Sequence, residues 1–139
     1  MPKNNSLPKK ERLYLRDELR LLFASRKSFV CYPFRVLYTW VPYQEGIPLK
    51  ILVSIPKKKL KHAVDRNRMK RLTREAYRLN NHKLKEELEC QDQKQTLLVG
   101  FIYLSDGLKR YEKVQNATIK ALDILIQSID NKEELEGLS

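Results

Sequence analysis

Residues 49–80 read LKILVSIPKKKLKHAVDRNRMKRLTREAYRLN, and this stretch contains the transition that decides the fold. Its first part, residues 49–55, is an apolar run that predicts a strand, and Pro56 ends the strand because proline cannot donate to a β-ladder. The remainder predicts a long helix from about His62 to beyond Leu79. The apolar stripe of this helix consists of Met69, Leu72, Ala76 and Leu79.

The segments on either side of this stretch complete an α+β pattern with one mixed sheet. They predict a helix over residues 12–23, strand alternation over 29–41, a frayed helix end with a loop over 83–94, a buried strand over 95–104 and a helix over 108–129. If the strands at 49–55 and 95–104 are neighbours, the helix between them makes them parallel. Residues 11–130 are therefore predicted as a single domain, between a disordered basic arm (1–10) and a frayed acidic tail (131–139).

Positive charge is concentrated in one part of the chain. The 139 residues carry a formal net charge of +11, with 20 basic and 6 acidic side chains in residues 1–78. Residues 57–78 alone hold ten basic and two acidic side chains. Such a concentration is typical of a protein that binds a polyanion, for which an anionic membrane surface is the main competitor of a nucleic acid.

The predicted long helix has a cationic face opposite its apolar stripe. On a helical wheel this face holds Arg66, Lys70, Arg71, Arg74 and Arg78. Like charges recur four residues apart, at Arg66/Lys70, Lys70/Arg74 and Arg74/Arg78, and should cost the isolated helix roughly 1 kcal/mol in total at low salt. A helix face that is only exposed to solvent usually carries both positive and negative side chains. The pattern therefore favours an anion-binding face over a solvated one.

Several other classes of protein are excluded. The longest apolar run has eight residues, 97–104, which is far short of the roughly 20 that a transmembrane helix needs. The polar N-terminus has no apolar core of a signal peptide, so we expect a cytoplasmic protein. Cys31 and Cys90 have no second pair near them and are predicted to be free thiols, and His62 and His82 lack the spacing of metal ligands.

No nucleotidase or nuclease signature is present either. The four glycines form no phosphate-binding loop, and no cluster of carboxylates has the pattern of a two-metal site. We therefore expect no catalytic residue and no metal site in the protein itself.

The basic helix resembles that of the protein subunit of bacterial ribonuclease P. The family pattern is of the kind K-K-x-x-x-A-V-x-R-N-R-x-K-R-x-x-R-E, and its register is occupied here by Lys58, Lys59, Ala63, Val64, Arg66, Asn67, Arg68, Lys70, Arg71, Arg74 and Glu75. The chain departs from the family at Lys61, where many members have glycine, and in a long connection over residues 81–94.

The resemblance implies an α-β-β-β-α-β-α fold with a central mixed sheet and a left-handed β-α-β crossover, where the general rule favours a right-handed one. It implies that the protein binds the catalytic RNA of ribonuclease P and the 5′ leader of precursor tRNA, so that the RNA can cleave the leader away. The expected contacts to the RNA subunit are Arg66, Asn67, Arg68, Lys70, Arg71 and Arg74. One protein per RNA is expected, with Mg²⁺ in the holoenzyme held mainly by the RNA.

The family's leader-binding cleft would be formed here by Leu19, Phe23, Tyr38, Lys58 and Lys59. Leu19 replaces an aromatic residue of the family, so stacking is weaker there. Phe23 with Tyr38 across from it is the expected stacking platform, the alternative being that the two rings belong to the core.

Two alternative functions are compatible with the same residues. A structural RNA-binding protein, such as a ribosomal protein, could use the same basic helix without turnover. A helix-turn-helix DNA-binding protein fits less well, because Pro56 and the flanking strands leave no partner helix at the proper spacing.

Overall fold

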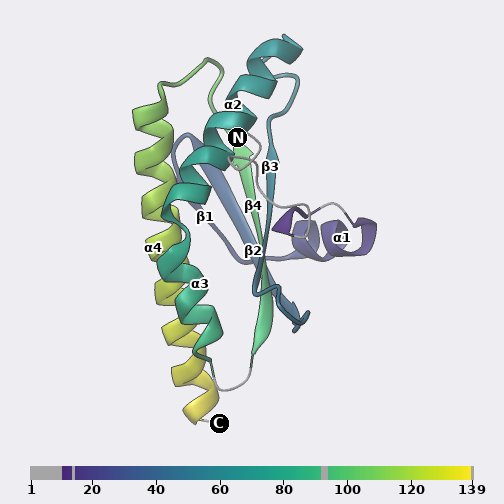
Figure 1. Ribbon diagram of the computed structural model, residues 1–139. Helices are drawn as coiled ribbons and strands as arrows, with labels where there is room; N and C mark the ends of the chain where they lie inside the picture. The colour runs from purple at the N-terminus through teal and green to yellow at the C-terminus, as the bar shows by residue number, and fades with distance from the viewer. Residues whose placement is uncertain (1–10, 14, 92–93, 139) are drawn as a thin grey trace.

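A four-stranded sheet in the order β1-β2-β4-β3 organises the chain (Figure 1). The computed structural model describes residues 11–13, 15–91 and 94–138, with side chains as far as Ile129. Its elements are α1 (Arg16–Ala24), β1 (Ser28–Cys31), β2 (Phe34–Pro42), β3 (Leu49–Ser54), α2 (Ala63–Asn80), α3 (His82–Glu89), β4 (Gln95–Tyr103) and α4 (Tyr111–Leu138). The predicted arm, residues 1–10, lies outside the described residues.

The sheet is mixed, as predicted. β2 pairs antiparallel with β1 and β4, while β3 and β4 are parallel in a register that runs from Leu49↔Leu97 to Ser54↔Ile102. In Figure 1 the chain leaves β3 at the top, descends through α2 and α3 in front of the sheet, and rises again in β4 to the left of β3. This path makes the crossover left-handed, which agrees with the family resemblance and not with the general rule.

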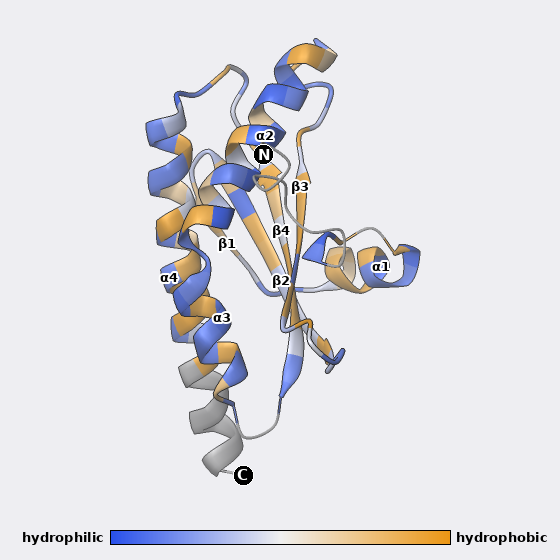
Figure 2. Cartoon of the chain, viewed as in Figure 1, coloured by the Kyte–Doolittle hydropathy of each residue, from blue (hydrophilic) through white to orange (hydrophobic). Residues whose placement is uncertain are grey.

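The sheet separates two hydrophobic cores of unequal size. On one face, α2, α3 and α4 cover a large core with fully buried Phe34, Tyr77 and Phe101. On the other face, α1 covers a small core of Leu13, Leu22, Val41 and Leu98. Figure 2 shows the resulting pattern, with apolar residues along the central strands and alternating apolar and hydrophilic stretches along α2 and α3.

The buried stripe of α2 differs from the prediction at one end. Met69 and Ala76 are fully buried as predicted, but Leu79 is 47% exposed and Tyr77 is buried in its place. At 100° per residue, Leu79 lies 80° from Met69 on one side and Tyr77 lies 80° from it on the other, so periodicity alone does not choose between them. The position of α4 makes the choice, because α2 packs against α4.

Residues 82–89 form α3, where a frayed helix end and a loop were predicted. Leu84 and Leu88 are buried one turn apart and attach this short helix to the large core. Charged residues surround these two leucines in the sequence and conceal them, which explains the wrong prediction.

Three other boundaries differ from the predicted ones. The alternation over residues 29–41 is a hairpin, because Tyr32 and Pro33 form a turn between β1 and β2. The first helix begins at Arg16 and not at Arg12, since Arg12 forms a bridge with Ile51 and the Leu13 N–H donates to the Ile51 carbonyl at 2.8 Å. α4 continues as far as Leu138, and the fraying of the tail stays a prediction.

Candidate nucleic-acid interface

The packing of α2 determines which of its side chains face solvent. Met69 and Ala76 anchor one side of the helix in the large core, so residues on the far side project outward. Asn67, Arg68 and Arg71 are exposed, and Arg66, Lys70 and Arg74 are half-buried. Within the described residues, none of Arg68, Lys70 and Arg71 forms an ion pair. These three cations are therefore available to an anionic partner.

Arg66 also has a structural role in the loop before α2. Its Nη1 donates to the carbonyl of Leu60 at 2.9 Å and to that of Lys61 at 2.8 Å. Leu60 is buried, so these bonds join the start of the helix to an anchored loop. His62 at the N-cap provides no side-chain cap, which leaves Arg66 to order this end of α2. The Lys61 position, where the family often has glycine, contributes its carbonyl to this arrangement.

Arg12 extends the cationic face, and nothing in the sequence pattern indicates this. Arg12 forms a parallel bridge with Ile51 of β3, which places the segment before α1 beside the sheet. Burial lowers the pKa of Arg74, and the positive charge of Arg12 lowers this pKa further. The two guanidinium groups therefore lie near each other, although 62 positions separate them in the chain.

Two other basic residues near α2 have acidic partners. The Arg78 Nη2 donates to Glu75 at 2.8 Å, and this carboxylate raises the pKa of Arg78. Lys59 lies 3.3 Å from the exposed carboxylate of Asp106, while Lys58 is exposed. The cationic surface is strongest in the first half of α2 and the loop before it.

The residues predicted for the leader cleft are divided between the two faces of the sheet. Leu19 packs against the small core, and Phe23 on the same helix is 55% exposed. The Tyr38 side chain packs against the large core, with its ring centroid 6.0 Å from that of Phe29 and its hydroxyl 3.4 Å from Ser128 Oγ of α4. The expected pairing of Phe23 across from Tyr38 is therefore wrong. Side chains alternate along a strand, and Leu37 of β2 faces α1 in place of Tyr38.

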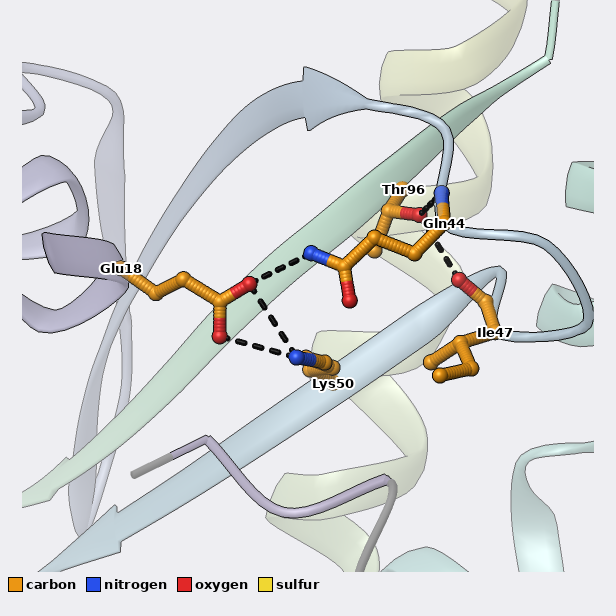
Figure 3. A network of polar contacts seen from close by, with 5 residues as sticks. All are labelled: Glu18, Gln44, Ile47, Lys50 and Thr96. Atoms are coloured by element: carbon orange, nitrogen blue, oxygen red, sulfur yellow. Dashed lines mark hydrogen bonds and ion pairs between the residues drawn. The ribbon is translucent and has the colours of Figure 1, made fainter. Parts of the chain in front are cut away.

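A buried polar network holds α1 against the sheet (Figure 3). Lys50 Nζ lies 2.9 Å from Glu18 Oε1, and their side chains are only 6% and 10% exposed. Gln44 Nε2 donates to the other carboxylate oxygen at 2.5 Å, and the Gln44 N–H donates to Thr96 Oγ1 at 2.9 Å. Thr96 in turn donates to the Ile47 carbonyl at 2.7 Å. The orientation of α1, and with it the exposure of Phe23, depends on this network.

The described part of the chain holds neither a metal site nor a membrane-spanning helix. Where side chains are described, over residues 11–13, 15–91 and 94–129, no group of three His, Cys, Asp or Glu side chains has the arrangement of a metal site. Within the same part of the chain, no helix is both long and apolar enough to cross a membrane. The two cysteines are free, as predicted.

Comparison with known proteins agrees with the pattern of the basic helix. Residues 7–102, more than half of the chain, match the model of the family described as Ribonuclease P. The chain belongs to the ribonuclease P protein family. A ribonuclease P protein component of Porphyromonas gingivalis is 43% identical over 121 residues, which are 87% of either chain. That of Chromohalobacter salexigens is 35% identical over 81 residues, which are 58% of this chain and 62% of the relative.

Solved structures of the family show the same fold. The RNase P protein of Staphylococcus aureus superposes with a TM-score of 0.59 over 83% of this chain and 94% of that one, at 20% sequence identity. A mutant of the same protein superposes with a TM-score of 0.60. As a member of the ribonuclease P protein family, the chain is a subunit of the ribonucleoprotein endoribonuclease that processes the 5′ end of tRNA.

Proposed function

We propose that the exposed face of α2 and the loop before it bind the catalytic RNA of ribonuclease P. The observation that carries this proposal is that Asn67 and Arg68 of the run Arg66–Asn67–Arg68 are exposed, while Met69 and Ala76 anchor the helix in the large core. Arginine holds phosphate oxygens with two parallel hydrogen bonds, and no acid of the described residues pairs with Arg68 to compete with them. Lys70, Arg71 and Arg74 continue the contact along the helix, with Arg12 beside Arg74.

We further propose that the 5′ leader of precursor tRNA passes along α1. A single-stranded leader offers base faces for stacking, and the half-exposed Phe23 ring is available for them, with Leu19 beside it. Lys58 and Lys59 would contact leader phosphates from the loop after β3. The packing of Tyr38 against α4 favours its role in the core over a role in the cleft.

The stoichiometry, the location and the metal requirement of the assembly are proposed from the membership in the family. We infer one protein per RNA, in the cytoplasm, with Mg²⁺ held mainly by the RNA. The acids of α2, Asp65 and Glu75, lie ten residues apart, or about 15 Å along a helix, and Glu75 is engaged by Arg78. These two carboxylates are too far apart to hold one ion together.

The test reconstitutes a bacterial ribonuclease P RNA with the wild-type protein or with Arg68→Ala. It measures both the affinity of the protein for the RNA and the cleavage of precursor tRNA. Removing a charged hydrogen-bonding group should weaken assembly with the RNA by about tenfold or more, while the melting temperature stays unchanged because Arg68 is exposed. If about six cations meet phosphates, log K should fall against log salt with a slope near −5.

The matched control is Lys83→Ala, which removes an exposed cation from α3 and should leave assembly unchanged. Normal assembly of Arg68→Ala would refute the assignment of the α2 face. Tight RNA binding without any stimulation of cleavage would indicate a purely structural RNA-binding protein instead.

A further inference from the structure

A hollow of about 340 Å³ opens between the turn that joins β1 to β2 and the first half of α4. Its lining includes Val30, Cys31 and Tyr32 from the hairpin and Lys113, Asn116 and Lys120 from α4. None of the proposed RNA contacts described above belongs to it.

The lining combines a solvent-exposed aromatic ring with positive charge. Tyr32 is 61% exposed, and the ammonium group of Lys109 lies 5.2 Å from the centroid of its ring. Lys113 and Lys120 contribute two more cations, and no carboxylate is part of the lining. Burial raises the pKa of the Cys31 thiol and the positive charge of Lys120 opposes this rise, in keeping with the place of both residues in the lining.

The hollow lies at the same end of the sheet as the start of α2. The turn between β1 and β2 follows the Cys31↔Phe34 pair, and Phe34 is in turn paired with Tyr103, the last residue of β4. The Leu104 N–H donates to the Pro33 carbonyl at 2.8 Å, which attaches the loop after β4 to this turn. The same loop contacts the one before α2 through the Lys59–Asp106 ion pair. Figure 1 shows the two loops and the turn together at the top of the molecule.

We propose that this hollow binds one unpaired nucleotide of the RNA partner, with the base stacked on Tyr32 and the phosphate between Lys113 and Lys120. Aromatic rings and cations together are the usual means of holding single-stranded RNA, because every base has a face to stack and every phosphate a charge. The RNA surface would then continue from α2 across the end of the sheet to α4. This inference rests on the proposed function, since it adds a contact to the same RNA-binding surface.

An acidic protein segment is the competing ligand for the two lysines. The exposure of the Tyr32 ring favours a nucleotide, because a flat ring beside a cation offers a stacking surface that a carboxylate does not use. Glu112 and Asp123 are exposed on the same helix. Their negative charges would repel an acidic segment that lies along α4 more than they would repel a single nucleotide that is confined to the hollow.

The experiment uses the full-length protein and a fluorescent 12-nucleotide oligouridine, with binding followed by anisotropy. Tyr32→Ala should weaken binding about fivefold, the lower end of what one base–aromatic stack contributes, whereas Tyr32→Phe should bind as the wild type does. The double variant Lys113→Gln/Lys120→Gln should make the salt slope shallower by about 1.4 if two phosphate contacts are lost. Oligouridine with 4-thiouridine should cross-link to the peptide that contains Tyr32.

The matched control is Lys94→Gln, because Lys94 lies 5.8 Å from the ring of Tyr43 in a similar pair at the opposite end of the sheet. This substitution should leave the affinity and the cross-link unchanged. Wild-type affinity and salt slope in the Lys113/Lys120 double variant, with no cross-link to Tyr32, would overturn the inference even if Tyr32→Ala unfolds. Failure of the proposed function would differ, because Arg68→Ala would then assemble normally with ribonuclease P RNA.

Discussion

The two faces of the sheet are built differently. The face under α2, α3 and α4 has a large core in which Phe34 packs edge-on against Phe101 and Tyr103, with ring centroids 5.5 and 6.0 Å away. The face under α1 has a small core, and the buried ion pair of Glu18 and Lys50 adds a polar contact between this helix and the sheet. Apolar burial therefore dominates on one face, and a polar network takes a large part on the other.

This difference matches what each face is proposed to do. A well-packed core fixes the rotation of α2, which leaves Arg68 and Arg71 exposed to solvent. α1 is too short to bury many residues, and it keeps Phe23 at the surface. The ion pair of Glu18 and Lys50 specifies how α1 lies on the sheet. It contributes little net stability, because the attraction between the two charges is largely cancelled by the cost of removing them from water.

The largest loss of stability is expected from Phe34→Ala in the large core. The side chain is fully buried between two aromatic rings, so its loss should reduce the free energy of unfolding by about 3 to 5 kcal/mol. Urea denaturation followed by circular dichroism measures this change. A loss below 1 kcal/mol would mean that the large core does not carry the stability of the domain.

A second test addresses the α1 face through Glu18→Ala. This change leaves the Lys50 ammonium buried without its carboxylate and should cost about 3 kcal/mol in the same denaturation assay. The double variant Glu18→Leu/Lys50→Met should regain most of that loss, because it removes both charges and retains volume. If the single variant keeps wild-type stability, the pair is not what holds α1.

The smallest effect is expected from Tyr77→Phe in the large core. The buried Tyr77 hydroxyl forms no hydrogen bond of good geometry among the described residues, although the Asn81 side chain lies near it, so its removal should change the stability at pH 7 by less than about 1 kcal/mol.

The same substitution should alter the response to alkaline pH. Burial raises the pKa of Tyr77 far above its usual value near 10. The unfolded chain therefore loses this proton first, and the folded state loses stability as the pH rises above about 10. Tyr77→Phe should lose less stability between pH 9 and 11, while the raised pKa values of Tyr103 and Tyr111 keep part of the effect. An identical pH profile for the two proteins would contradict this assignment.

Much of the fold and of the basic helix could be predicted because those signals are local. The strands and α2 follow from alternation and from helical periodicity, and Met69 and Ala76 are buried as the stripe requires. α3 was missed because two leucines among charges are too few for a periodic signal. Leu79 was misplaced because the position of α4, which lies 30 and more residues further along, decides which edge of the stripe is covered.

The family, the cationic helix and the order of the elements apart from α3 follow from the sequence alone, since each depends on residues that are close together in the chain. The packing of the elements is needed to show that Tyr38 turns away from Phe23, that Arg12 bridges to β3, and that the hairpin turn meets α4 in a cationic hollow. These arrangements join residues far apart in the chain. They depend on strand order, strand register and the face that each helix covers, none of which is expressed in the periodicity of a single segment.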